Sequence, residues 1–203
     1  MSYTYNPIYS HFQGDDISRV EKVERIVVET INNSKMPDKD RSWGKVFEVK
    51  HSSSCIQLGR LLAQKRGLDQ ELCAVICALH DVYVFETGRV TDHARKGVPI
   101  AQKILNKIGG FGDGEIKTIL KGVKNHSDKH LVSKDPYVEF MKDVDALDCS
   151  LYEGVHDAYL YEKSEKIVKT YFARIKKVRE ELGLPYEEQW DNFELLKDYG
   201  DKV

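Results

Sequence analysis

The chain has 203 residues, of which 41% are hydrophobic and 32% are charged, and its formal net charge is −2 at pH 7. This composition is that of an ordinary globular protein, and the length is typical of one domain with a sizeable core. The balanced charge lacks the basic excess of proteins that bind duplex nucleic acid, so we expect no such partner.

Two further features bear on the compartment. No run of apolar residues approaches the roughly 18 that a membrane span needs, and residues 1–14 lack the apolar centre of a signal peptide. The chain has four cysteines but no Cys-x-x-Cys pair, which favours buried free thiols in a reducing environment. The sequence therefore predicts a cytoplasmic protein without a membrane segment.

Apolar residues recur at helical spacing along nearly the whole chain. A first helix is predicted to begin near Asp16, which can act as its N-cap. A second helix is predicted over residues 42–65 and carries His51. Asp69 is predicted to cap a third helix. Residues 82–90 are expected to form a loop or a short turn.

The middle of the chain continues the helical pattern. A fourth helix is predicted to begin at Thr91 or Asp92. The glycine-rich segment 109–114 indicates a loop, and residues 115–125 then form a fifth predicted helix. Pro136 is expected to begin a sixth helix, because proline is well tolerated in the first turn.

The last part of the chain is predicted to be helical as well. A long, highly charged helix is expected over residues 155–182, followed by a short one over residues 185–199. The apolar stripe of the long helix is expected to pack on the core, and a homodimer contact is the alternative. With no convincing strand, the sequence predicts an all-α, single-domain helical bundle over residues 1–203.

A buried polar pair is the most informative local feature. The apolar run over residues 72–79 leads directly into His80 and Asp81. A helix this apolar is expected to be buried on most of its surface, and a buried imidazole and carboxylate are unfavourable unless a metal or a charge partner satisfies them. A His–Asp hydrogen bond between two helices is the alternative. Further residues of metal-ligating types lie elsewhere in the chain: His51, His93, His126 and Asp143.

The order of these residues resembles that of the HD-domain superfamily of metal-dependent phosphohydrolases, in its small stand-alone prokaryotic type. The His-x-x-x-Gly segment at His93, the dipeptide His126-Ser127 and the Asp-x-Asp-x-Leu-Asp segment are also similar to that superfamily. The likeness covers about residues 47–151. It implies a helical bundle of the HD-domain type with its metal site in that core, followed by C-terminal helices at about 155–199.

The resemblance also implies a ligand set, in which the first aspartate of the acidic segment binds the metal. The implied metal ligands are His51, His80, Asp81 and Asp143. Two rivals, Asp145 and Asp148, lie about 200° and 140° around the helix from Asp143, so we expect them to have other roles. Of the implied ligands, Asp81 and His80 are the expected catalytic residues.

Several residues near this set are candidates for supporting roles. His93 and His126 are expected to bind a second metal or a substrate phosphate. Lys124, Arg95 and Lys121 are candidate phosphate-binding residues, because they neighbour these histidines along the chain.

Nitrogen and oxygen ligands suit one or two divalent ions, with Mn²⁺, Fe²⁺, Co²⁺, Ni²⁺, Mg²⁺ and Zn²⁺ as the candidates. The resemblance implies hydrolysis of a phosphate ester or anhydride in a nucleotide or a similar small molecule, by water that the metal activates. A di-iron oxygenase of the HD type and a non-catalytic nucleotide-binding module are the alternatives. The expected partner is a small phosphorylated substrate, not a membrane.

Overall fold

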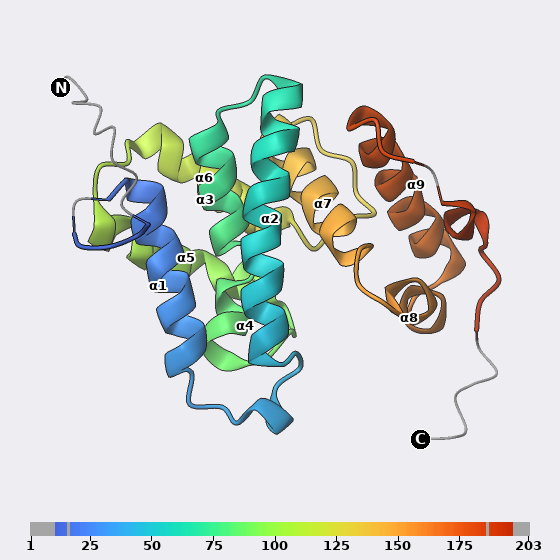
Figure 1. Cartoon of the computed structure of the whole chain (residues 1–203), viewed down its shortest axis with the longest axis horizontal. Helices are drawn as coiled ribbons and strands as arrows, with labels where there is room; N and C mark the ends of the chain where they lie inside the picture. The colour runs from blue at the N-terminus through green and yellow to red at the C-terminus, as the bar shows by residue number, and fades with distance from the viewer. Residues whose placement is uncertain (1–10, 16, 186, 197–203) are drawn as a thin grey trace.

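The computed structural model describes residues 11–15, 17–185 and 187–196 (Figure 1). Within these residues all regular secondary structure is helical, in agreement with the all-α prediction. None of the helices in this part of the chain is long and apolar enough to cross a membrane. The helices are α1 (Arg19–Asn33), η1 (Asp38–Asp40), α2 (Lys45–Arg66), α3 (Gln70–Leu79), α4 (Val82–Thr87), α5 (His93–Ile108), α6 (Asp113–Asn125), α7 (Pro136–Cys149), α8 (Val155–Glu162), α9 (Glu165–Glu181) and η2 (Glu188–Asp191).

The centre of the fold is α3, which contacts α1, α2, α6 and α7. Each residue from 72 to 79 is buried, as an all-apolar helix requires. As predicted, Asp69 caps this helix by accepting hydrogen bonds from the backbone N–H groups of Glu71 and Leu72. The end of α3 therefore places His80 and Asp81 deep inside the protein.

The first helix begins later than predicted. Ser18 is its N-cap, and Ser18 and Glu21 form a capping box in which each side chain accepts a hydrogen bond from the other's backbone. Asp16, the predicted cap, lies outside the described residues. The reciprocal hydrogen bonds explain why the helix begins at Arg19.

The segment 82–90 is a helix where a loop was expected. Helix α4 covers most of it, because Val82, Val84 and Phe85 are all fully buried against the core. The helix ends at Gly88, which has a φ of 68°, a conformation that glycine adopts without strain. Burial of three apolar side chains thus decides the conformation of a segment that looks loop-like because of its glycine.

The long C-terminal helix of the prediction is interrupted. Lys163 has an extended backbone and separates α8 from α9. In Figure 1 the axes of these two helices run in different directions. The break allows Leu160 to pack with Phe172 and Trp190 in a second apolar cluster. In the predicted last helix, residues 185–199, the described residues form only the short helix η2. Residues 186 and 197–199 lie outside the described residues.

The second cluster joins the main core through α7. Ala146 belongs to it, while Val144 and Leu147 on the same helix belong to the main core. Helix α9 packs on α7, so α7 lies between the main bundle and the C-terminal helices (Figure 1). This arrangement gives α7 one face toward the bundle and another toward α9.

Candidate metal centre

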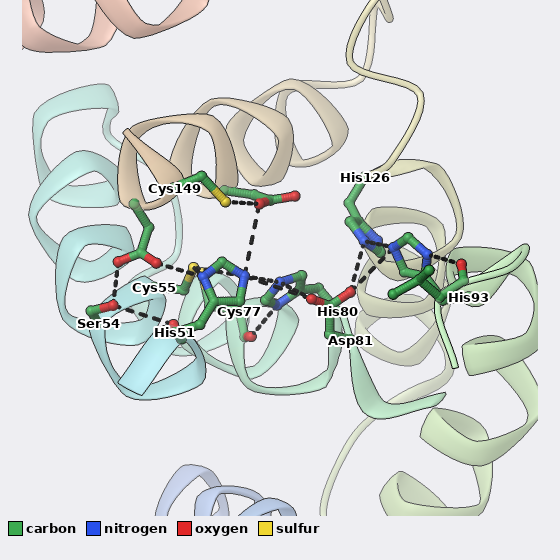
Figure 2. A network of polar contacts seen from close by, with 12 residues as sticks. His51, Ser54, Cys55, Cys77, His80, Asp81, His93, His126 and Cys149 are labelled. Carbon is green, nitrogen blue, oxygen red and sulfur yellow. Dashed lines mark hydrogen bonds and ion pairs between the residues drawn. The ribbon is translucent and has the colours of Figure 1, made fainter. Parts of the chain in front are cut away.

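Four histidines from four helices converge on one aspartate (Figure 2). His51 projects from the middle of α2, His80 and His126 follow the last residues of α3 and α6, and His93 is the first residue of α5. Asp81 lies between them. All are buried except His93, whose side chain is 18% exposed. The structure therefore brings together five of the six residues proposed from the sequence as ligands.

Each of the four imidazole rings is held by a hydrogen bond at its Nδ1 atom. The Nδ1–H groups of His80, His93 and His126 each donate a hydrogen bond of 2.7 Å to the backbone carbonyl three residues earlier. The Nδ1–H of His51 donates to Oδ2 of Asp148 at 2.5 Å. In its neutral form, a ring whose Nδ1 donates carries its lone pair on Nε2, which is then the atom that can bind a metal.

The Nε2 atoms form two close pairs. His51 and His80 approach to 3.0 Å between their Nε2 atoms, and His93 and His126 also approach to 3.0 Å. Two lone pairs at this distance repel each other unless a cation or a proton lies beside them. Ligands at right angles on one ion, with bonds of about 2.1 Å, would be about 3.0 Å apart. The spacing of each pair fits two ligands of one ion.

Asp81 directs one oxygen to each pair. Its Oδ2 lies 3.2 Å from Nε2 of His80 and 3.6 Å from that of His51. Its Oδ1 lies 3.2 Å from Nε2 of His126 and 3.3 Å from that of His93. Among the described residues, this Oδ1 is the buried side-chain oxygen left without a hydrogen-bond partner. Because such an orphaned acceptor is unfavourable, the donor set fits bound metal, with one oxygen of Asp81 available to each histidine pair.

Helix α7 adds two carboxylates near His51. Oδ1 of Asp145 lies 3.8 Å from the Nε2 of His51, on the side of the ring that faces His80. Asp148 contacts the opposite nitrogen, and its second oxygen accepts a hydrogen bond from the hydroxyl of Ser54. Asp145 therefore lies where it could add an oxygen ligand, and Asp148 lies where it orients His51.

Asp143 is not part of the centre, and the expectation for it is corrected. Its carboxylate is fully buried on the other face of α7, 2.6 Å from Arg174 and 2.7 Å from Arg66. Residues two apart on a helix diverge by about 200°. Because Asp143 faces the arginines, Asp145 faces the histidines. The rotation expected from the sequence is correct, but it turns Asp145, not Asp143, toward the histidines.

Three other residues proposed from the sequence lie outside the site. Lys124 is exposed, Lys121 forms an ion pair with Asp135 at 2.7 Å, and Arg95 forms one with Asp92 at 2.9 Å. None of the three lysine and arginine side chains lines the cavity beside the histidines. Lys124 and Arg95 are each two residues from a site histidine, so the helix turns them about 200° away.

The charges of the site depend on its burial and its close contacts. Burial alone would lower the pKa of His51, but the carboxylates of Asp148 and Asp81 raise it to about 10. Burial opposes ionisation of Asp81, yet the surrounding histidines hold its pKa well below the usual range. Burial lowers the pKa of His126. A divalent ion at His51 would therefore have to displace a firmly bound proton.

Two cysteines lie closer to the centre than the sequence suggested. Sγ of Cys55 is 3.7 Å from Nδ1 of His51, and the thiol of Cys149 donates to Oδ1 of Asp145 at 3.4 Å. Both could join a ligand group with their neighbours. Burial raises the pKa of each thiol well above its ordinary value, which disfavours the thiolate that binds metal. Both are free, as are Cys73 and Cys77.

A cavity of about 330 Å³ opens onto the centre. Trp43 and Phe47 line one part of it, and their ring centroids are 5.7 Å apart. Lys129, whose ammonium is 2.5 Å from Oδ2 of Asp145, lines another part. The sequence did not point to Lys129, because it lies in a polar connecting segment where a lysine is ordinarily solvated. Besides the residues of the centre, the lining also includes Ser127, Cys149, Val155, Ala158, Tyr159, Glu162, Lys163 and Tyr171.

Residues 49–149 match the family model described as the HD domain, which agrees with the resemblance inferred from the motifs. This stretch contains His51, the adjacent His80 and Asp81, and all of α7. No curated protein and no solved structure matches the chain.

Proposed function

Since this chain carries an HD domain, we propose that it is a metal-dependent phosphohydrolase that cleaves a phosphate ester or anhydride of a nucleotide or a similarly small molecule. One observation carries the proposal: Asp81 directs its two buried oxygens to two separate histidine pairs. A carboxylate placed in this way suits a bridge between two divalent ions, the arrangement of many phosphate-cleaving sites.

The residues divide into two ligand groups that share Asp81. His51, His80 and Asp145 would hold one ion, and His93 and His126 would hold the other. Their nitrogen and oxygen donors suit Mn²⁺, Fe²⁺, Co²⁺, Ni²⁺, Mg²⁺ or Zn²⁺. Bound ions supply an activated water molecule and neutralise charge on the phosphoryl oxygens.

Hydrogen bonds within the chain orient the imidazole rings, and nearby carboxylates set the charge of the centre. The hydrogen bond from His51 to Asp148 fixes the ring, and the three backbone carbonyls fix the other rings. Three carboxylates, those of Asp81, Asp145 and Asp148, lie around the imidazole rings, and Lys129 supplies positive charge beside Asp145. The excess of negative charge favours cations at the centre, and the ammonium of Lys129 favours an anionic substrate beside it.

The cavity supports a small substrate. Its volume of about 330 Å³ lies at the lower end of ligand pockets, which span roughly 300–1,000 Å³. Aromatic side chains line it beside the charged centre, so it suits a molecule with a phosphate and an apolar or ring-shaped remainder. Duplex nucleic acid does not suit a pocket of this size.

The test is hydrolysis by the full-length chain after loading with Mn²⁺, Co²⁺ or Fe²⁺, with mononucleotides, dinucleoside polyphosphates and generic phosphodiesters as substrates. We expect turnover that Asp81→Ala abolishes and Asp143→Asn retains in the fraction that remains folded. Turnover unchanged by Asp81→Ala would contradict the assignment.

A second function is favoured by one detail of the same cluster. Each group contains two histidines and one carboxylate oxygen of Asp81, and two histidines with a carboxylate also form the iron site of many oxygenases. We test this alternative by loading the protein with Fe²⁺ and measuring oxygen consumption with candidate organic substrates. Oxygen uptake without phosphate release would favour the oxygenase over the hydrolase.

A further inference from the structure

The lining of the cavity includes two lysines, Lys129 and Lys163, that belong to neither group of proposed metal ligands. Lys129 precedes α7, and Lys163 separates α8 from α9. Between them lies Tyr171, whose ring centroid is 5.5 Å from the ammonium of Lys129 and 5.4 Å from that of Lys163. Both lysines line the cavity that opens onto the metal centre, so an anion bound in it would lie near two ammonium groups.

The position of Lys129 is fixed by contacts on both ends of the residue. Its ammonium forms a buried ion pair with Asp145, and its backbone carbonyl accepts a hydrogen bond of 2.7 Å from Nε of Arg174. This cation therefore stands beside the metal centre without rearrangement.

Lys163 reaches the cavity because the expected long helix is broken there. Its extended backbone lies between the two helices, and its ammonium is 5.3 Å from the ring centroid of Tyr159. Its side chain is 24% exposed, and its carboxylate neighbour, Glu162, is 3.9 Å away and largely exposed. An exposed pair at this distance contributes little, so Lys163 keeps most of its capacity to bind an anion.

We propose that Lys129 and Lys163 form an anion-binding subsite that makes this chain selective for small phosphomonoesters over phosphodiesters. The inference rests on the proposed phosphohydrolase function and names the substrate class. A terminal phosphate carries between 1.5 and 2 negative charges at about pH 7, whereas a diester carries one and has a second substituent. Two lysines beside the metal centre stabilise the dianion more, and the cavity of about 330 Å³ leaves little room for the second substituent.

The test compares two substrates with the same leaving group, p-nitrophenyl phosphate and bis(p-nitrophenyl) phosphate, on the Mn²⁺-loaded full chain. We expect the wild type to prefer the monoester. Lys163→Met should raise KM for the monoester about tenfold or more, as loss of a charge-assisted hydrogen bond predicts, with KM for the diester within about twofold. Lys163→Arg should restore most of the preference. The matched control is Lys166→Met, because Lys166 is exposed on α9 and lies outside the cavity lining.

Binding of inorganic phosphate, measured by calorimetry, gives a readout that does not depend on turnover. We expect Lys163→Met to weaken phosphate binding about tenfold and Lys166→Met to leave it unchanged. If the protein hydrolyses both substrates and Lys163→Met changes KM equally for the two, the subsite is overturned and the phosphohydrolase function is retained. Lysine-dependent phosphate binding without any hydrolysis would support the subsite and overturn the function. Unchanged phosphate binding in Lys163→Met would also overturn the subsite.

Discussion

Asp143 and Asp145 lie two residues apart on α7 and face opposite environments. Asp143 lies between Arg66 and Arg174, and Asp145 lies beside His51 and Lys129. The two carboxylates are both buried, so a substitution at either one perturbs the protein, but in different ways.

For Asp145→Asn we expect loss of one of two bound metal ions, because this carboxylate belongs to one ligand group, together with a lower free energy of unfolding, because its ion pair with Lys129 is buried. For Asp143→Asn we expect unchanged metal content but a free energy of unfolding lower by about 3–5 kcal/mol, as when one partner of a buried ion pair is removed. Elemental analysis and urea denaturation measure the two effects. Metal loss in Asp143→Asn and not in Asp145→Asn would reverse the assignment.

Asp148 orients His51 through the bond to Nδ1. We expect Asp148→Asn to weaken metal affinity by about 10- to 100-fold, as substitutions of such supporting groups do. Competition with a coloured chelator measures the affinity. The control is Asp157→Asn, because Asp157 is exposed on α8 and contacts His156 instead of the centre. Equal affinities in the two variants would contradict the role of Asp148.

The raised pKa of His51 predicts how pH affects the metal-free protein. The group has a folded-state pKa of about 10 against an ordinary value of 6.5. Its protonated form therefore stabilises the fold fully below about pH 6.5, and this contribution is lost as pH rises toward 10. We expect the Tm of the metal-free protein to fall over that range.

The metal-loaded protein should behave differently, because the ion replaces the proton on His51. We expect its metal affinity to increase as pH rises through the same range, and the decline in Tm to disappear. Thermal unfolding with and without Mn²⁺ at several pH values measures both effects. A Tm that falls equally with and without metal would argue against a metal at His51.

A glycine keeps α6 close to α3, and so positions His126. A Cβ on Gly122 would lie 2.8 Å from Cγ2 of Ile76 in the core. We expect Gly122→Ala to lower the free energy of unfolding by about 1–3 kcal/mol, as overpacking does. The control is Gly114→Ala in the same helix, where a Cβ would meet nothing within 4 Å. That substitution should be neutral or stabilise by up to about 1 kcal/mol. Denaturant unfolding of both variants measures the difference.

Much of the fold could be predicted from helical periodicity and local caps. The cap at Asp69 and the first turn at Pro136 depend on neighbouring residues alone, and both predictions are confirmed. The helix over residues 82–87 and the break at Lys163 depend on which apolar side chains become buried in the two apolar clusters. Such tertiary packing is not visible in the spacing of residues along the chain.

The candidate site, like the fold, could be predicted from the sequence only in part. The four histidines and Asp81 could be proposed from their order along the chain, because that order resembles the HD-domain superfamily. The identity of the aspartate on α7 could not, because the absolute rotation of that helix depends on where Arg66 and Arg174 lie. Lys129 could not be proposed either, because its burial results from packing against α9.

We propose that Asp81 and the two pairs of histidines would together hold two divalent ions. The metal-to-chain ratio tests this, measured on full-length protein loaded with Mn²⁺ or Fe²⁺ and freed of excess ion, and on His93→Ala and Asp81→Ala. We expect a ratio near two for the wild type, near one for His93→Ala and near zero for Asp81→Ala. A wild-type ratio near one that His93→Ala leaves unchanged would contradict it.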